Sequence, residues 1–136
     1  MTILRSSLLY LAMVPVFFLI DMIWLGLIAR GIYFRYLGQL LLDNFNWAAA
    51  IIFYLIFIVG ILVFAVVPAL EKNSLSRAVV LGGLFGFFCY ATYDLTNLAT
   101  LKGWPLPLTF IDIIWGTVLS GLVATAGFLI GKYFIR

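Results

Sequence analysis

Three aspartates, Asp21, Asp94 and Asp112, each interrupt an apolar run that is long enough to cross a membrane. A charged side chain at such a depth costs roughly 2.5–3.5 kcal/mol on insertion scales, and it persists only where it faces protein, water or a partner. Two close carboxyl groups can share a proton and act as general acid and base. The sequence therefore presents these three residues as candidates for binding or catalysis.

The segment around Asp94, YATYDLTNLAT, adds hydroxyl and amide side chains to the carboxylate. By helical spacing, Tyr90 and Asn97 share the stripe of Asp94. Tyr93 and Thr100 lie beside that stripe and bring two further hydroxyl groups. This segment predicts a polar face on an otherwise apolar helix.

The composition indicates an integral membrane protein, because 66% of the 136 residues are hydrophobic and only 10% are charged. The eight Lys and Arg residues stand singly between apolar blocks, which is typical of topology signals and not of a nucleic-acid surface. Histidine is absent and Cys89 is the one cysteine, so the chain has no internal disulfide and no thiolate or imidazole metal site. We predict no metal centre, and the composition leaves the question of a cofactor open.

Four apolar segments are predicted to cross the membrane, at about residues 6–28, 47–69, 78–101 and 108–133, since a span needs roughly 20 residues. Between the first two, Arg35, Gln39 and Asp43 recur every four residues among apolar side chains. That pattern favours an interfacial amphipathic helix, although an ordered loop fits it as well. The expected fold is all-α: an integral four-helix bundle forming a single transmembrane domain over residues 1–136.

The distribution of basic residues predicts that both termini are cytoplasmic, because the cytoplasmic side carries the excess of Lys and Arg. On the side of the termini lie Arg5, Lys72, Arg77, Lys132 and Arg136. On the other side lie Arg30, Arg35 and Lys102.

This topology places the three aspartates at one depth in the outer half of the bilayer. Asp21 and Asp94 lie about seven residues before the outer ends of their helices, and Asp112 lies about four after its helix begins, so at about 1.5 Å per residue the depths agree within roughly 5 Å. We expect one pocket there. The candidate ligand-binding residues are Asp21, Trp24, Tyr90, Tyr93, Asp94, Asn97, Thr100, Trp104, Asp112 and Trp115.

A purely structural network is the alternative to a pocket. Arg30, Arg35 and Lys102 are cations on the same side as the aspartates, and charges inside a membrane generally pair. Against this, the concentration of unlike polar groups in one layer is more than pairing alone requires.

Two further patterns concern packing and symmetry. Gly82, Gly83 and Gly86, and the ladder of Gly116, Ser120 and Ala124, predict close helix contacts. The segments IDMIW at 20–24 and IDIIW at 111–115 are similar, but they lie on helices of opposite direction, which favours coincidence or convergence on one site chemistry over duplication. Near the end of the first span, α-helical spacing puts Asp21, Trp24 and Ile28 on one face.

Three long motifs carry a resemblance to a known family. They read DMIWLGLIARGIY at Asp21–Tyr33, YATYDLTNLATLKGWPLPLT at Tyr90–Thr109 and DIIWGTVLS at Asp112–Ser120. Together they closely resemble the predicted bacterial membrane proteins of domain of unknown function 2177. The resemblance covers essentially the whole chain and implies a four-helix protein of the bacterial inner membrane. It implies no particular activity, and catalytic residues stay open.

Four functions are compatible with these patterns. The first is binding of a lipid or small amphiphile whose polar head enters the pocket from the outer leaflet. The second is an Asp-dependent intramembrane enzyme that acts on a lipid-phase substrate. The third is a proton- or cation-coupled transporter, which would require a homodimer because four helices are few for such a path. The fourth is an accessory subunit of a larger membrane complex.

Overall fold

The computed structural model describes residues 1–135, and every regular element among them is helical. In chain order these are α1 (Ile3–Ile23), the π-helical turn η1 (Trp24–Ile28), α2 (Arg30–Leu37), α3 (Trp47–Ile61), the π-helical turn η2 (Leu62–Val66), α4 (Val67–Glu71), α5 (Leu75–Thr100) and α6 (Leu106–Phe134). The first π-helical turn continues α1, and the second joins α3 to α4. Four helices are therefore long and apolar enough to cross a membrane, namely Ile3–Ile28, Trp47–Glu71, Leu75–Thr100 and Leu106–Phe134. The predicted all-α membrane fold is confirmed.

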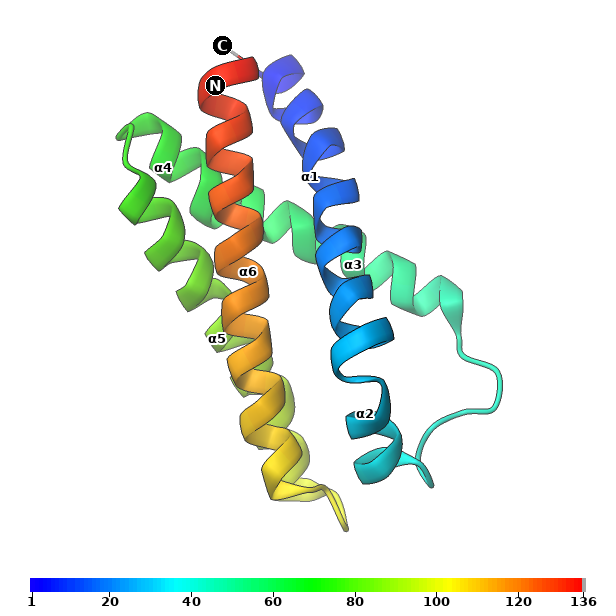
Figure 1. Cartoon of the computed structure of the whole chain (residues 1–136). Helices are drawn as coiled ribbons and strands as arrows, with labels where there is room; N and C mark the ends of the chain where they lie inside the picture. Colours follow the sequence, from blue (N-terminus) through cyan, green and yellow to red (C-terminus); the bar gives the residue numbers. More distant parts are fainter. Residues whose placement is uncertain (136) are drawn as a thin grey trace.

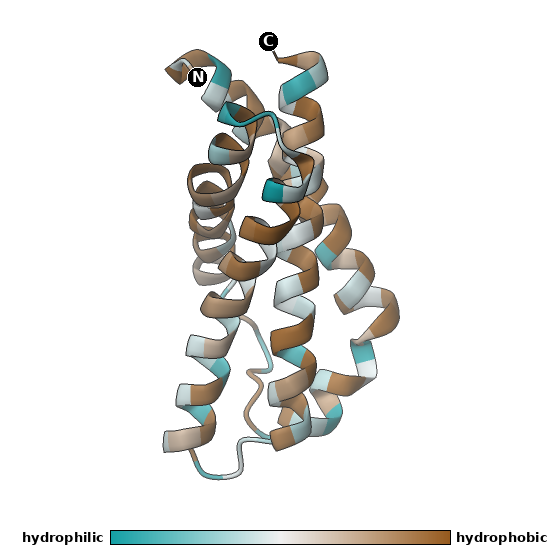
Figure 2. Cartoon of the chain, turned by 90° about the vertical axis from the view of Figure 1, so that its left-hand side faces the viewer, coloured by the Kyte–Doolittle hydropathy of each residue, from teal (hydrophilic) through white to brown (hydrophobic). Residues whose placement is uncertain are grey.

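Both termini lie at one end of the bundle, together with the turn between α4 and α5 (Figure 1). Helices α1 and α6 run in opposite directions beside each other, whereas α3 crosses them obliquely (Figure 1). Helix α2 and the turn between α5 and α6 occupy the opposite end. Hydrophobic residues colour most of the length of the helices, and hydrophilic ones gather in the connections and toward both ends of the bundle (Figure 2).

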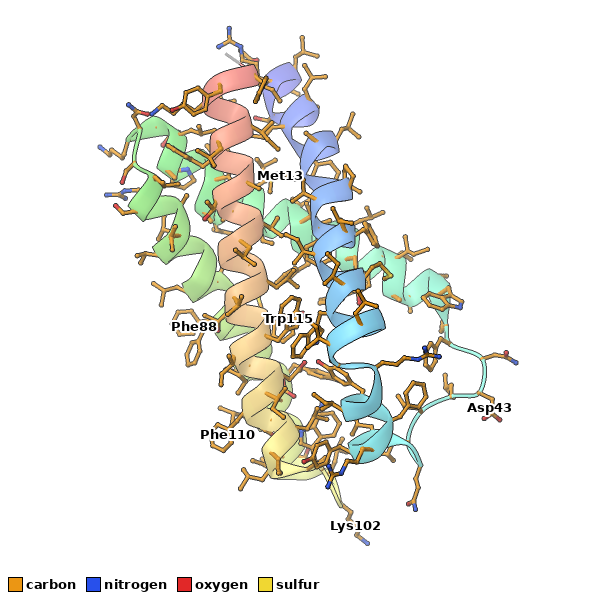
Figure 3. The ribbon with its side chains drawn as sticks, in the orientation of Figure 1. Met13, Asp43, Phe88, Lys102, Phe110 and Trp115 are labelled. Carbon is orange, nitrogen blue, oxygen red and sulfur yellow. The ribbon has the colours of Figure 1, made fainter. Side chains whose placement is uncertain are left out.

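The apolar core lies nearer to the termini than the aspartates do. Leu9, Met13 and Phe17 of α1 are fully buried in it, where they join apolar residues of α3, η2 and α6. Phe88 and Phe110 instead point outward from the bundle, which suits side chains that face lipid (Figure 3). The core thus holds the helices together at one end and leaves the polar residues to meet at the other.

The close packing of α5 on α6 depends on small residues, as the sequence predicts. A Cβ atom added to Gly86 would overlap the carbonyl oxygen of Gly116 and the side chain of Ser120. At Gly82 it would come within 2.8 Å of the carbonyl oxygen of Ser120. Gly83 differs, because its nearest neighbour would be an atom of Thr117 at 3.7 Å, which is ordinary contact.

The end of α1 departs from α-helical geometry, and this corrects one prediction. In η1 the Ala29 N–H donates to the carbonyl oxygen of Trp24 over 2.7 Å, five residues back. Because this turn is wider than an α-helical turn, the residue that points into the bundle comes one position later in the chain. Ala29 is therefore fully buried, while Ile28 is 60% exposed and does not share the buried face of Asp21.

Candidate ligand-binding site

A cavity of about 210 Å³ lies at the end of the bundle away from the termini. Its polar and aromatic lining comes from all four long helices and from α2. The lining residues are Asp21, Trp24, Leu25, Tyr33, Leu37, Tyr54, Tyr90, Tyr93, Asp94, Trp104, Leu108, Asp112 and Trp115. The three aspartates, far apart in sequence, thus line one cavity.

Asp21 and Asp112 each accept a hydrogen bond from an aromatic side chain of another helix. The Trp115 Nε1–H on α6 donates to Asp21 Oδ1 over 3.3 Å, and the Tyr33 hydroxyl on α2 donates to Asp112 Oδ1 over 2.8 Å. The Trp24 Nε1–H in turn donates to the Tyr33 hydroxyl over 3.2 Å. These bonds tie α1, α2 and α6 together around the cavity.

Tyr33 acts in this network as a neutral donor. Burial raises the pKa of its hydroxyl, and the negative charge of Asp112 raises it further. The proton therefore stays on the phenol at any ordinary pH. A phenol that accepts from Trp24 and donates to Asp112 uses both of its hydrogen-bonding functions.

Asp94 differs from the other two aspartates. It is 0% exposed, and neither carboxyl oxygen has a hydrogen-bond partner among residues 1–135. The Asp112 carboxyl lies beside it, but two carboxylates both accept, so neither can satisfy the other unless a proton lies between them. The indole N–H of Trp104, which also lines the cavity, has no acceptor among the described residues. Unsatisfied buried polar groups are rare, and these two belong to residues that line one cavity.

None of the basic residues among residues 1–135 belongs to the cavity lining. Arg30, Arg35 and Lys102 are all exposed. The Arg35 guanidinium lies over the ring of Tyr36, 5.7 Å from its centroid. The side chains that bind Asp21 and Asp112 are an indole and a phenol, and no cation offsets the acidic lining.

Two of the candidate residues lie outside the lining. Asn97 is half-buried, and its backbone carbonyl oxygen accepts a hydrogen bond from the Leu101 N–H at the end of α5. Thr100 is exposed and donates its hydroxyl to the carbonyl oxygen of Thr96. The other eight candidates line the cavity.

Tyr33 and Tyr54 line the cavity although neither was a candidate from the sequence. Tyr33 lies in the connector predicted to be interfacial, and it reaches the cavity because α2 continues beyond α1 and contacts α6 (Figure 1). Tyr54 lies beside Asp21 from a span without any charge. A single tyrosine in an apolar span is only a weak indication of a binding site. A buried hydroxyl nevertheless needs a hydrogen-bond partner, and this requirement could have identified Tyr54 as a cavity residue.

An apolar groove of about 420 Å³ adjoins the cavity. Phe53 and Phe57 of α3 and Cys89 of α5 form its apolar part. Tyr90, Tyr93 and Asp112 line both spaces. Phe53 is 50% exposed, so the groove opens on the outer surface of the bundle.

A family model described as "Predicted membrane protein (DUF2177)" matches residues 6–129 of the chain. No curated protein and no solved structure matches it. The matched range contains the three aspartates and all the residues that line the cavity and the groove.

Proposed function

The chain belongs to the DUF2177 family of predicted membrane proteins, and we propose that it is a multi-pass membrane protein that binds a lipid or small amphiphile. The polar head would occupy the acidic cavity and the apolar chain the groove. The continuity of the two spaces through Tyr90, Tyr93 and Asp112 supports this proposal most directly. A pocket that is apolar over most of its wall, with a few convergent polar groups, is the usual form of a small-molecule site.

The proposed setting is the inner membrane of a bacterium, with both termini in the cytoplasm. The cavity then lies in the outer half of the bilayer. Because the groove opens between α3 and α5, an amphiphile would enter sideways from the lipid without leaving the membrane. This route needs no aqueous path across the bundle. A transporter would need such a path, so the route favours binding over transport.

Mass spectrometry of co-purified lipid tests the proposal. Protein extracted in mild detergent is compared with Cys89→Trp, which fills the groove, and with Phe88→Trp, which adds the same side chain at the neighbouring position. Phe88 is 62% exposed and points away from the bundle (Figure 3), so it is a matched control. We expect a specific lipid or amphiphile with the wild type and Phe88→Trp and its loss with Cys89→Trp. The same lipid content in all three proteins would reject the proposal.

An Asp-dependent enzyme is the second candidate, and the position of Asp112 beside Asp94 favours it. Two adjacent carboxyl groups that share one proton can donate and accept a proton in turn on a bound substrate. Asp94→Asn and Asp112→Asn would each abolish turnover of a lipid-phase substrate, whereas Asp43→Asn in the exposed connector would not. Turnover that survives both cavity variants would exclude this mechanism.

A further inference from the structure

The chemistry of the lining restricts the head group that the cavity can take, provided that the amphiphile-binding function proposed above holds. Three carboxyl groups line the space, and no Lys or Arg in the part of the chain that the structure describes does so. A phosphate or carboxylate head group would meet acidic groups without a cation to pair with, in surroundings where unpaired charge is costly. Anionic amphiphiles, including lipids whose phosphate must enter the cavity, are therefore disfavoured.

The aromatic part of the lining favours a cation over a neutral head. Three tryptophans and four tyrosines surround the carboxyl groups. A cation within about 6 Å of an aromatic ring is attracted to the face of that ring, and the attraction is stronger where water is excluded. A carboxylate enclosed by aromatic rings thus stabilises an ammonium group in two ways.

Asp94 distinguishes between kinds of ammonium group. Both of its oxygens lack a hydrogen-bond donor among the described residues, and its side chain is fully buried. A protonated amine carries N–H donors that would satisfy these oxygens by charge-assisted hydrogen bonds, whereas a quaternary ammonium has none. We propose that the ligand is an amphiphile with a protonated amine head, which donates to Asp94 beside Asp112 while its apolar chain lies along Phe53, Phe57 and Cys89.

A fluorescence titration with three probes of equal chain length tests this inference. The background variant is Trp47→Phe, because Trp47 is 62% exposed at the start of α3 and the other three tryptophans all line the cavity. The probes are octylamine, octyltrimethylammonium and 1-octanol, added at neutral pH and one fixed detergent concentration. We expect saturable quenching by octylamine, with an affinity at least about tenfold higher than that of either other probe.

The variants give a second, independent comparison. Asp94→Asn should weaken octylamine binding by about tenfold or more and leave octanol unchanged, because only the amine uses the carboxylate charge. Asp43→Asn, far from the cavity in the connector, should bind like the background protein (Figure 3). A thermal unfolding curve for each variant shows whether it is folded, and the comparison of the three probes does not depend on any aspartate variant.

Each contrary result has a distinct meaning. If octanol or octyltrimethylammonium binds as tightly as octylamine, or if Asp94→Asn leaves octylamine binding unchanged, the amine inference is wrong while amphiphile binding stands. If no probe gives saturable quenching, the amine inference is wrong. The co-purified lipid in Cys89→Trp and Phe88→Trp then decides separately whether the broader function fails as well.

Discussion

The indole rings of Trp24 and Trp115 stack with their centroids 4.4 Å apart and their planes 8° from parallel. Each tryptophan follows an aspartate by three residues, in the similar segments IDMIW and IDIIW. Trp115 donates to Asp21, the aspartate of the other segment, and Trp24 reaches Asp112 through the Tyr33 hydroxyl. The two segments therefore bond to each other's aspartate across the stacked rings. This reciprocal arrangement gives the repeated pattern a structural reason that requires no duplication.

Removal of the bridging hydroxyl tests that arrangement. Tyr33→Phe leaves the Trp24 indole without its acceptor and Asp112 without its donor, so we expect the free energy of unfolding to fall by about 1–3 kcal/mol. Tyr36→Phe is the control, since Tyr36 is half-buried on the same helix and keeps its ring under Arg35. Unfolding is followed by circular dichroism in one detergent. Equal stability of the two variants would mean that the bridge contributes nothing.

Asp94→Asn should stabilise the ligand-free protein. Its carboxyl group is buried without a hydrogen-bond partner among residues 1–135, and an amide removes the cost of burying charge and can donate to Asp112. We expect a gain of about 1–2 kcal/mol, or a few degrees in Tm, in delipidated protein. Asp43→Asn on the surface should leave Tm unchanged. A lower Tm for Asp94→Asn would show that Asp94 serves the fold and is not held ready for a ligand.

Two glycines on one helix test the packing of α5 against α6. Gly86→Ala should lower the free energy of unfolding by about 1–3 kcal/mol, because the added methyl group meets the α6 backbone, which cannot move aside. Gly83→Ala places the same group at ordinary contact distance and should be neutral or slightly stabilising, since alanine favours helix. Thermal unfolding in detergent measures both variants. The idea fails if the two substitutions have the same effect.

Cysteine labelling tests the orientation in the membrane. In a Cys89→Ala background, Ser76→Cys lies near the turn between α4 and α5, at the end that holds both termini, and Lys102→Cys lies at the opposite end (Figures 1 and 3). Both positions are exposed. A membrane-impermeant thiol reagent applied to intact cells should label Lys102→Cys alone. Labelling of Ser76→Cys from outside would invert the topology and place the cavity in the inner half of the bilayer.

That the three aspartates line one cavity could be predicted, because their positions along the helices depend on few quantities. Helix rise is fixed, and the predicted outer ends of the spans lie at about residues 28, 101 and 108, so counting residues gives the depth of each side chain. The sequence predicts less directly which face of each helix lines the cavity. Asn97 shares a stripe with Asp94 by spacing, yet it lies one turn nearer to the end of α5 and outside the lining.

The residues that the sequence did not identify owe their positions to long-range packing. Tyr33 lines the cavity because α2 contacts α6, and no local pattern in residues 29–37 encodes that contact. Tyr54 depends on the oblique crossing of α3, which sets which side of an apolar helix faces Asp21. Helix propensity and hydropathy do not determine the position of either tyrosine, because each position depends on how whole helices pack against one another.

The π-helical turn η1 makes the number of residues between Asp21 and Tyr33 as important as their identity. A Cβ atom added to Gly26, inside the turn, would meet nothing within 4 Å, so Gly26→Ala should be tolerated. Deletion of Gly26 is a different change, since each α-helical residue advances the chain by about 100° and a regular helix in place of η1 would turn Tyr33 away from Asp112. Chains that keep this site should therefore vary in side chains through 26–28 but keep the length of the segment, so that an insertion or deletion there marks a relative that has lost the Tyr33 bridge.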